Sequence, residues 1–219
     1  MDYTFQWGVV WKAWPELAHG ALVTIELTVL CMLLGLAFGT LLAVAKLSQR
    51  RALGLLSQCW VEIARNTPAL LQVYLAYFGL GAFGIHLDPW WAVLLAVTFN
   101  SAGYLTEILR GGLLAVSPQQ RAAALSLGMR SWQAYGYVIL PQVLRIVFLP
   151  VMNQLVWTLL ATSLGMIIGL NDLAGETAIQ QSLTFRPFEF YTVAALLYYL
   201  IAKSMIVTAQ ASGRRLFRY

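Results

Sequence analysis

The chain has 219 residues, of which 60% are hydrophobic and 11% are charged, and its mean hydropathy is +0.71. Soluble domains are roughly 45–50% apolar and about 25% charged, so this chain has too few charges to cover a soluble surface. Disorder is also excluded, because it requires low hydrophobicity and high charge. The composition therefore indicates a multi-pass membrane protein. The net charge of +5 would also suit a nucleic-acid partner, and the positions of the basic residues decide that question.

Five apolar segments are long enough, or nearly so, to cross the hydrocarbon core of a membrane, which takes about 20 residues of helix. The expected spans are residues 20–45, 66–84, 89–108, 142–169 and 189–211. The fourth contains Pro150, which predicts a kink or a break inside it. Since no repeat and no low-complexity linker divides the chain, residues 1–219 are expected to form a single all-α membrane domain.

The basic residues predict how these spans are oriented. Eleven of the fourteen Lys and Arg residues fall on one side of the five spans, namely Lys46, Arg50, Arg51, Arg65, Arg110, Arg121, Arg130, Arg145, Arg214, Arg215 and Arg218. By the positive-inside rule this side is cytoplasmic, which places the N-terminus outside and the C-terminus inside. The net positive charge is thus explained by topology, and no nucleic-acid partner is expected.

Residues 111–141, between the third and fourth spans, carry the signals of a short helix rather than of a simple loop. Ser117 is a favoured N-cap, Pro118 suits the first helical position, and Gln120 has the spacing of a capping box. Gly128 is placed to end the helix in the left-handed conformation. The sequence therefore predicts a cytoplasmic helix within residues 117–130.

This predicted helix has a thin profile, because small Ala and Ser side chains fill its centre and would let another surface approach its backbone. Leu125, Leu127 and Met129 add an apolar contact surface, and Ser131 is expected to cap a second short helix that runs toward residue 141. The alternative is an amphipathic helix lying on the membrane. Such helices carry several basic residues and bulky anchors, which this centre lacks. Docking onto another protein is therefore favoured.

The loop resembles the EAA loop of the membrane subunits of bacterial ATP-binding-cassette (ABC) importers. The pattern of that loop is E-A-A, three residues, G, nine residues and I-x-L-P. Ala123 and Ala124 match the two alanines, Gly128 matches the glycine, and residues 138–141 (VILP) match the close with valine for the first isoleucine. Ala122 replaces the glutamate of the pattern.

Three further stretches resemble the polar amino-acid permeases of that group, so that the resemblance covers nearly the whole chain from about residue 20. Residues 107–112 read EILRGG, residues 62–72 fit E-x-x-R-x-T-P-x-x-x-Q, and Asn153 precedes Thr-Ser-Leu at residues 162–164. The motif residues are Glu62, Arg65, Thr67, Pro68, Gln72, Glu107 and Arg110.

The resemblance implies the MetI-like transmembrane domain of a type I ABC importer, with five transmembrane helices and a cytoplasmic coupling helix, in the cytoplasmic (inner) membrane of a bacterium. It implies a second permease subunit, identical or paralogous, a dimer of ABC ATPase subunits, an extracytoplasmic solute-binding protein and a small amino acid as cargo, besides the surrounding lipid. The residues expected to couple to the ATPase are Ser117, Arg121, Ala123, Ala124, Leu127, Gly128 and Met129.

Nucleotide chemistry is expected in the partner rather than in this chain. The sequence contains no GxxxxGK[ST] phosphate loop, so ATP and Mg²⁺ are assigned to the ATPase. Neither histidine lies in a metal-binding motif, and the chain is expected to hold no metal or cofactor and to be no enzyme.

Polar residues inside the third and fourth spans are the candidates for the substrate pathway, because polar groups within a membrane are expensive unless they face water or a partner. The set comprises Asn100, Tyr104, Asn153, Gln154, Thr158, Thr162 and Ser163. The alternative for each residue is a hydrogen bond between helices, with no contact to substrate.

The fourth span also bears on the kind of amino acid. Relatives that carry cationic amino acids commonly read N-E-F and later K-D-T-S-L, where this chain reads N-Q-L at residues 153–155 and L-A-T-S-L at residues 160–164. Since the carboxylates that would pair with a cationic side chain are missing, we expect a neutral or acidic substrate of the glutamate, aspartate or glutamine type. A cationic substrate remains an alternative, because Glu26 in the first span is a carboxylate.

Two other classes of protein fit the sequence less well than the importer permease. A self-sufficient secondary transporter or channel usually has more spans and internal inverted repeats, neither of which is found here. An integral membrane enzyme would need acidic or histidine side chains gathered at one membrane face, and the acidic residues are scattered singly.

Overall fold

The computed structural model describes residues 3–216, without the side chains of residues 212 and 214–216. Every regular element in that range is a helix, which confirms the all-α prediction. In chain order the elements are α1 (Trp7–Lys12), α2 (Trp14–Leu47), α3 (Arg51–Asn66), α4 (Ala69–Tyr74), η1 (Leu75–Gly79), α5 (Pro89–Ala115), α6 (Pro118–Ser126), α7 (Ser131–Gln133), η2 (Ala134–Ile139), α8 (Leu140–Ala161), η3 (Thr162–Ile168), α9 (Leu173–Thr184) and α10 (Pro187–Leu216).

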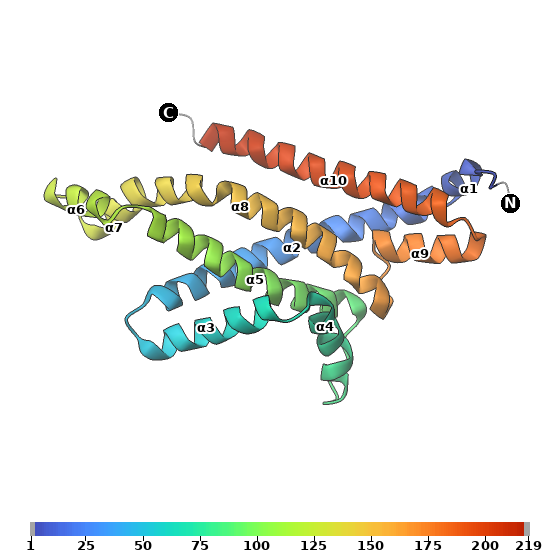
Figure 1. Cartoon of the computed structure of the whole chain (residues 1–219), viewed down its shortest axis with the longest axis horizontal. Coiled ribbons are helices and arrows are strands. Elements are labelled where there is room, and N and C mark those ends of the chain that lie inside the picture. The colour runs from blue at the N-terminus through green and yellow to red at the C-terminus, as the bar shows by residue number, and fades with distance from the viewer. Residues whose placement is uncertain (1–2, 217–219) are drawn as a thin grey trace.

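The long helices lie side by side along the length of the molecule (Figure 1). The short helix α6 and the C-terminal end of α10 lie at one end, and α1 and α9 lie at the other (Figure 1). Of the basic residues used to orient the chain, Arg218 and the side chains of Arg214 and Arg215 lie outside the described residues.

Among the described residues, four helices are long and apolar enough to cross a membrane, namely Trp14–Leu47, Pro89–Ala115, Ser131–Ile168 and Pro187–Ala211. The expected span at 66–84 differs, because its apolar helix covers only Ala69–Gly79. At 1.5 Å per residue this helix is about 16 Å long, roughly half of the hydrocarbon core. The structure therefore does not confirm the count of five spans.

Pro68 determines where this helix begins. Proline disfavours helical geometry in the residue before it, and Thr67 is accordingly extended, with φ −117° and ψ 143°. The chain therefore turns between α3 and α4, and Figure 1 shows α4 leaving the direction of α3 near the middle of the molecule. The helix α3 itself was not predicted from the sequence.

Two other boundaries differ from the prediction. The first span begins at Trp14 rather than at residue 20, with Pro15 in its first turn. In the fourth span, α8 is continuous through Pro150, and the geometry changes at Thr162, where the 3-10 helix η3 begins. The expected break thus lies about three turns beyond the proline.

The helix α5 lies at the centre of the bundle and packs against α2, α3, α4 and α8. Glycines allow the closest of these contacts: a Cβ at Gly39 of α2 would lie 2.9 Å from the Cβ of Leu105 on α5. Packing of small residues against a neighbouring helix is the usual way for membrane helices to associate. The α2–α5 pair therefore forms a rigid frame for the polar residues described below.

At the far end from α6, a buried carboxylate joins three helices. Asp172 is fully buried and caps α9, accepting a 2.9 Å hydrogen bond from the backbone N–H of Gly175. Its other oxygen accepts hydrogen bonds from the hydroxyl of Thr24 on α2, at 3.4 Å, and from that of Tyr198 on α10, at 3.3 Å. One side chain thus connects α2, α9 and α10.

Burial raises the pKa of Asp172 to about 6, although its hydrogen bonds act in the opposite direction. Since the folded pKa lies above the unfolded one, the contribution to stability is fully present below the unfolded pKa and is lost as the pH rises through about 6. We expect unfolding of the detergent-solubilised protein to become easier by about 1 kcal/mol between pH 5 and pH 7. Asp172→Asn removes the titrating carboxyl group, so the melting temperature of this variant should depend less on pH than that of the wild type. If the melting temperature of the variant changes with pH as much as that of the wild type, Asp172 is not the group responsible.

Candidate functional site

The helix predicted within residues 117–130 is present as α6, with the predicted N-cap, first-turn proline and terminating glycine. The hydroxyl of Ser117 accepts a hydrogen bond from the backbone N–H of Gln119 at 3.3 Å, and Pro118 is the first helical residue. Gly128 has a φ of +82° and ends the segment in the left-handed conformation. The capping box expected with Gln120 is not formed, because the cap bonds to Gln119 instead.

The surface of α6 is divided between an exposed side and a side that packs on its own chain. Leu127 is 83% exposed, whereas Ala124 is buried and Met129 is partly buried. The guanidinium of Arg121 lies 5.6 Å from the ring centroid of Tyr135 on η2. Leu127 is therefore a predicted coupling residue that is available to a partner, and Ala124 is not available to one.

The second short helix is present but is capped differently from the prediction. Arg130, rather than Ser131, is the N-cap, and its backbone N–H donates to the side chain of Gln133 at 2.8 Å. From Ser131 the helix runs on through α7, η2 and α8. Since α6 packs on η2, a displacement of α6 would act on the end of the long helix that carries the polar residues of the fourth span.

One cluster of polar residues fixes the turn between α3 and α4. The side-chain amide of Asn100 donates to the backbone carbonyl of Ala64 at 2.9 Å and to the side chain of Gln72 at 3.0 Å. Gln72 donates in turn to the carbonyl of Ala64 and to both oxygens of Thr67. Asn100, predicted as a pathway residue, thus forms one hydrogen-bonded corner with the motif residues Gln72, which is buried, and Thr67, which is exposed.

A second polar cluster joins α5 to α8. The hydroxyls of Ser101 and Thr158 lie 3.0 Å apart, and Gln154 donates to Ser101 at 3.5 Å. These side chains are buried within the chain, so in this conformation they serve as contacts between helices. Thr162 and Ser163 each donate to a backbone carbonyl three residues earlier in the helix. Gln154 and Thr158 thus join α8 to α5 through Ser101.

Two of the predicted pathway residues, in contrast, lie at the accessible side of the bundle. Tyr104 is half-buried on α5, and Asn153 is exposed on α8. The ring of Tyr104 lies 5.9 Å from that of Trp157 and 5.2 Å from the guanidinium carbon of Arg65. Sequence reasoning did not select Trp157, although its spacing of four residues from Asn153 places both on one helix face.

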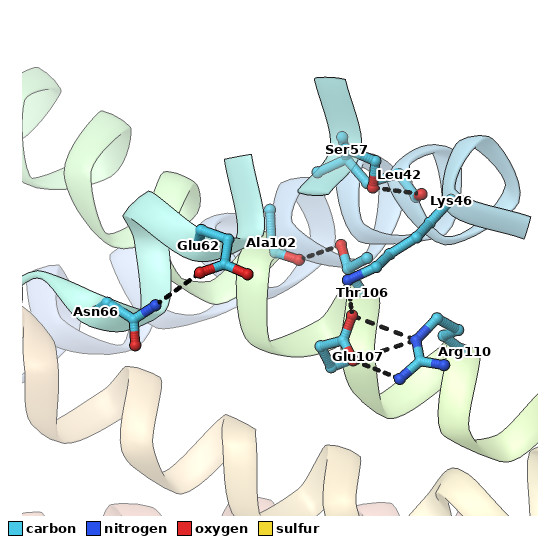
Figure 2. Close-up of polar contacts among 9 residues, drawn as sticks. All are labelled: Leu42, Lys46, Ser57, Glu62, Asn66, Ala102, Thr106, Glu107 and Arg110. Atoms are coloured by element: carbon cyan, nitrogen blue, oxygen red, sulfur yellow. Dashed lines mark hydrogen bonds and ion pairs between the residues drawn. The ribbon is translucent and has the colours of Figure 1, made fainter. Parts of the chain in front are cut away.

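The motif residues Glu107 and Arg110 form an ion-pair cluster with Lys46 (Figure 2). Glu107 is 2.7 Å from Lys46 on α2, and Arg110 donates to it through two nitrogens. The ion pair between Glu107 and Lys46 therefore joins α2 to α5 beside the predicted cytoplasmic loop. Glu62 does not join this cluster: its carboxylate accepts a 3.3 Å hydrogen bond from Asn66 (Figure 2).

A metal site is not formed by the described residues, in which no three His, Cys, Asp or Glu side chains come together.

Comparison with known proteins gives consistent results. The family model described as "Binding-protein-dependent transport system inner membrane component" matches residues 35–218. The chain is 32% identical over 214 residues to the glutamine transport system permease protein GlnP of Escherichia coli, covering 97% of this chain and 98% of GlnP. It is 28% identical over 203 residues to the arginine transport system permease protein ArtQ of Bacillus subtilis, covering 92% of this chain and 93% of ArtQ.

Two solved structures share the fold. A chain of an amino acid ABC transporter crystallised with histidines has a TM-score of 0.89 and 32% identity, with 97% of this chain and 100% of that chain covered. A chain of the inward-facing MetNI methionine ABC transporter has a TM-score of 0.68 at 19% identity, with both chains covered completely. The second likeness supports the MetI-like fold alone.

Proposed function

Because the chain belongs to the family of binding-protein-dependent transport system inner membrane components and resembles polar amino-acid permeases along its whole length, we propose that it forms half of the translocation pathway of an ATP-driven amino-acid importer. In this proposal it pairs with a second permease subunit, identical or paralogous, and accepts its amino acid from an extracytoplasmic solute-binding protein. A dimer of separate ATPase subunits binds ATP and Mg²⁺.

The observation that carries the proposal is the connection from α6 to α8. The exposed side of α6 presents Leu127 at one end of the molecule, its opposite side packs on η2, and η2 runs into α8 without interruption. Closure of an ATPase dimer against α6 would therefore shift α8 relative to α5. A shift of this kind can favour one of two access states, as alternating access requires.

We further propose that the chain crosses the membrane five times, with the N-terminus outside and the C-terminus in the cytoplasm. The helices α3, α4 and η1 would together make the second crossing. This arrangement is supported by the long apolar helices and by the basic residues near α6. Accessibility of single cysteines introduced at Gln6 and at Gln119 to an impermeant maleimide, in right-side-out vesicles, tests it: labelling is expected at Gln6 alone.

The substrate we propose is a neutral or acidic amino acid. Gln154 occupies the position where relatives that carry cations commonly have glutamate, and it bonds to Ser101 within the chain. The curated relatives themselves include a glutamine and an arginine permease, so the chain's own residues carry this choice. Uptake of each of the twenty amino acids by vesicles containing the full importer tests it. Uptake of arginine or lysine alone would contradict it.

The importer is distinguished from a secondary transporter or channel by its energy source. We expect uptake into vesicles to require ATP inside and the solute-binding protein outside, and to persist after an uncoupler has collapsed the ion gradients. Uptake by the chain alone, driven by an ion gradient, would instead support the secondary transporter.

A further inference from the structure

An arginine lies beside two aromatic rings where three helices meet. Arg65 is near the end of α3 and is exposed. Its guanidinium carbon is 5.2 Å from the ring centroid of Tyr104 on α5, and that ring is 5.9 Å from Trp157 on α8. Figure 1 shows α3 ending beside α5 near the middle of the molecule, far from the end that carries α6. Arg65 was counted from the sequence among the cytoplasmic charges, but it lies away from the loop charges.

The backbone next to Arg65 is held against α5 through the preceding residue, Ala64. A Cβ at Gly103 of α5 would lie 2.6 Å from the Cβ of Ala64, so α3 reaches α5 only because residue 103 is glycine. Asn100 holds the carbonyl of Ala64 through a 2.9 Å hydrogen bond. The hydrogen bonds with Gln72 and Asn100 therefore hold the backbone from which the Arg65 side chain reaches Tyr104.

The charge of Arg65 is not balanced by an acidic side chain. Among the described residues, the ion pairs join Lys46 and Arg110 to Glu107 and Arg186 to Glu189, and none includes Arg65. The neighbouring carboxylate of Glu62 bonds to Asn66 instead. An arginine within a membrane protein costs on the order of 3 kcal/mol on insertion scales unless it faces water or an anion. We therefore expect the exposed side chain of Arg65 to face an aqueous pathway.

We propose that Arg65 binds the α-carboxylate of the transported amino acid. A guanidinium presents two parallel N–H donors that match a carboxylate. The contact of Arg65 with the Tyr104 ring, 5.2 Å from the guanidinium carbon to the ring centroid, is a cation–π contact and occupies none of these donors with a hydrogen bond. Asn153 shares the helix face of Trp157 and supplies a further exposed polar group nearby. The inference rests on the proposed import function. It adds to that function the residue that binds the α-carboxylate, a group that all amino acids share.

The test separates carboxylate recognition from structural support. The permease–ATPase complex in lipid nanodiscs is assayed for binding of a radiolabelled amino acid, with its α-amide as competitor. Each pair consists of an amino acid and its α-amide: L-glutamine and L-glutamine α-amide, L-glutamate and L-isoglutamine, or L-arginine and L-arginine amide. The pair used is the one whose free amino acid the importer takes up. For the wild type we expect the acid to bind on the order of tenfold to a hundredfold more tightly than the amide, as for a charge-assisted hydrogen bond.

Arg65→Gln should lose this preference, so that acid and amide bind equally weakly, and Arg65→Lys should retain part of it. Arg51→Gln, at the other end of α3, is the matched control and should retain the wild-type ratio. If Arg65→Gln weakens the acid and the amide by the same factor, the residue is only structural and the proposal fails. If the wild type itself does not prefer the acid, the carboxylate site is refuted, while ATP-dependent uptake still decides the import function independently.

Discussion

Leu127→Asp should abolish association with the ATPase while leaving the permease folded. Leu127 is 83% exposed at the end of α6, where a partner would bury it. Burying a leucine side chain contributes about 1.5–3 kcal/mol, and burying an unpaired carboxylate instead adds a desolvation cost. We therefore expect the affinity for the ATPase to fall on the order of 100-fold or more, measured by co-purification in detergent and by titration of the reconstituted complex.

Leu183→Asp provides the control for this change. Leu183 lies on α9 at the opposite end of the molecule and is 70% exposed, so it receives the same substitution in a comparable environment. It should retain the ATPase, and both variants should show the thermal stability of the wild type. Deletion of residues 117–129 should also release the ATPase. If the ATPase remains bound to Leu127→Asp at wild-type affinity, α6 is not the coupling helix.

The sequence predicted the elements whose signals are local. Ser117, Pro118 and Gly128 defined α6 because caps and positive-φ glycines act within a few residues, and the structure places all three as expected. The long apolar helices were predicted for the same reason, since twenty consecutive apolar residues are a sufficient signal. The family followed from spacings that the fold requires at several places in the chain.

The parts that could not be predicted depend on contacts between distant residues. The roles of Asn100 and Gln72 are set by a turn that brings residues 28 positions apart within 3.0 Å. The sequence predicts Asn100 as a pathway residue and gives no signal of its hydrogen bonds at the corner between α3 and α4. In the sequence, Trp157 is indistinguishable from other apolar residues of a span. Only the packing of α8 on α5 places it beside Tyr104.

The shortened helix after Pro68 shows the same limit. Hydropathy alone predicts a span over residues 66–84, whereas the apolar helix begins only after Pro68 and covers Ala69–Gly79. The turn was visible in the sequence as a Thr-Pro pair. Its consequence, a hydrogen-bonded corner beside Arg65, required the position of α5.

Gly112→Leu should strongly destabilise the permease, although leucine is the better helix former. A Cβ at Gly112 of α5 would lie 2.2 Å from Cγ1 of Val147 and 3.3 Å from Cγ1 of Val143, both on α8. The branched valine side chains have few rotamers with which to move away, so the two helices must separate. Overpacking of this kind costs about 1–3 kcal/mol, or several degrees of melting temperature for a chain of this size.

Gly111→Leu is the matched control, because a Cβ there meets nothing within 4 Å and residue 111 is exposed. It should melt at the wild-type temperature or slightly above it, since leucine favours the helix over glycine. Adding Val147→Ala to Gly112→Ala should recover most of the stability that Gly112→Ala loses, and a double-mutant cycle measures this coupling. Equal melting temperatures for Gly111→Leu and Gly112→Leu would show that α5 and α8 do not touch here. The contact lies just before α6, so its loss should also uncouple ATP hydrolysis from uptake in whatever fraction of the protein still assembles.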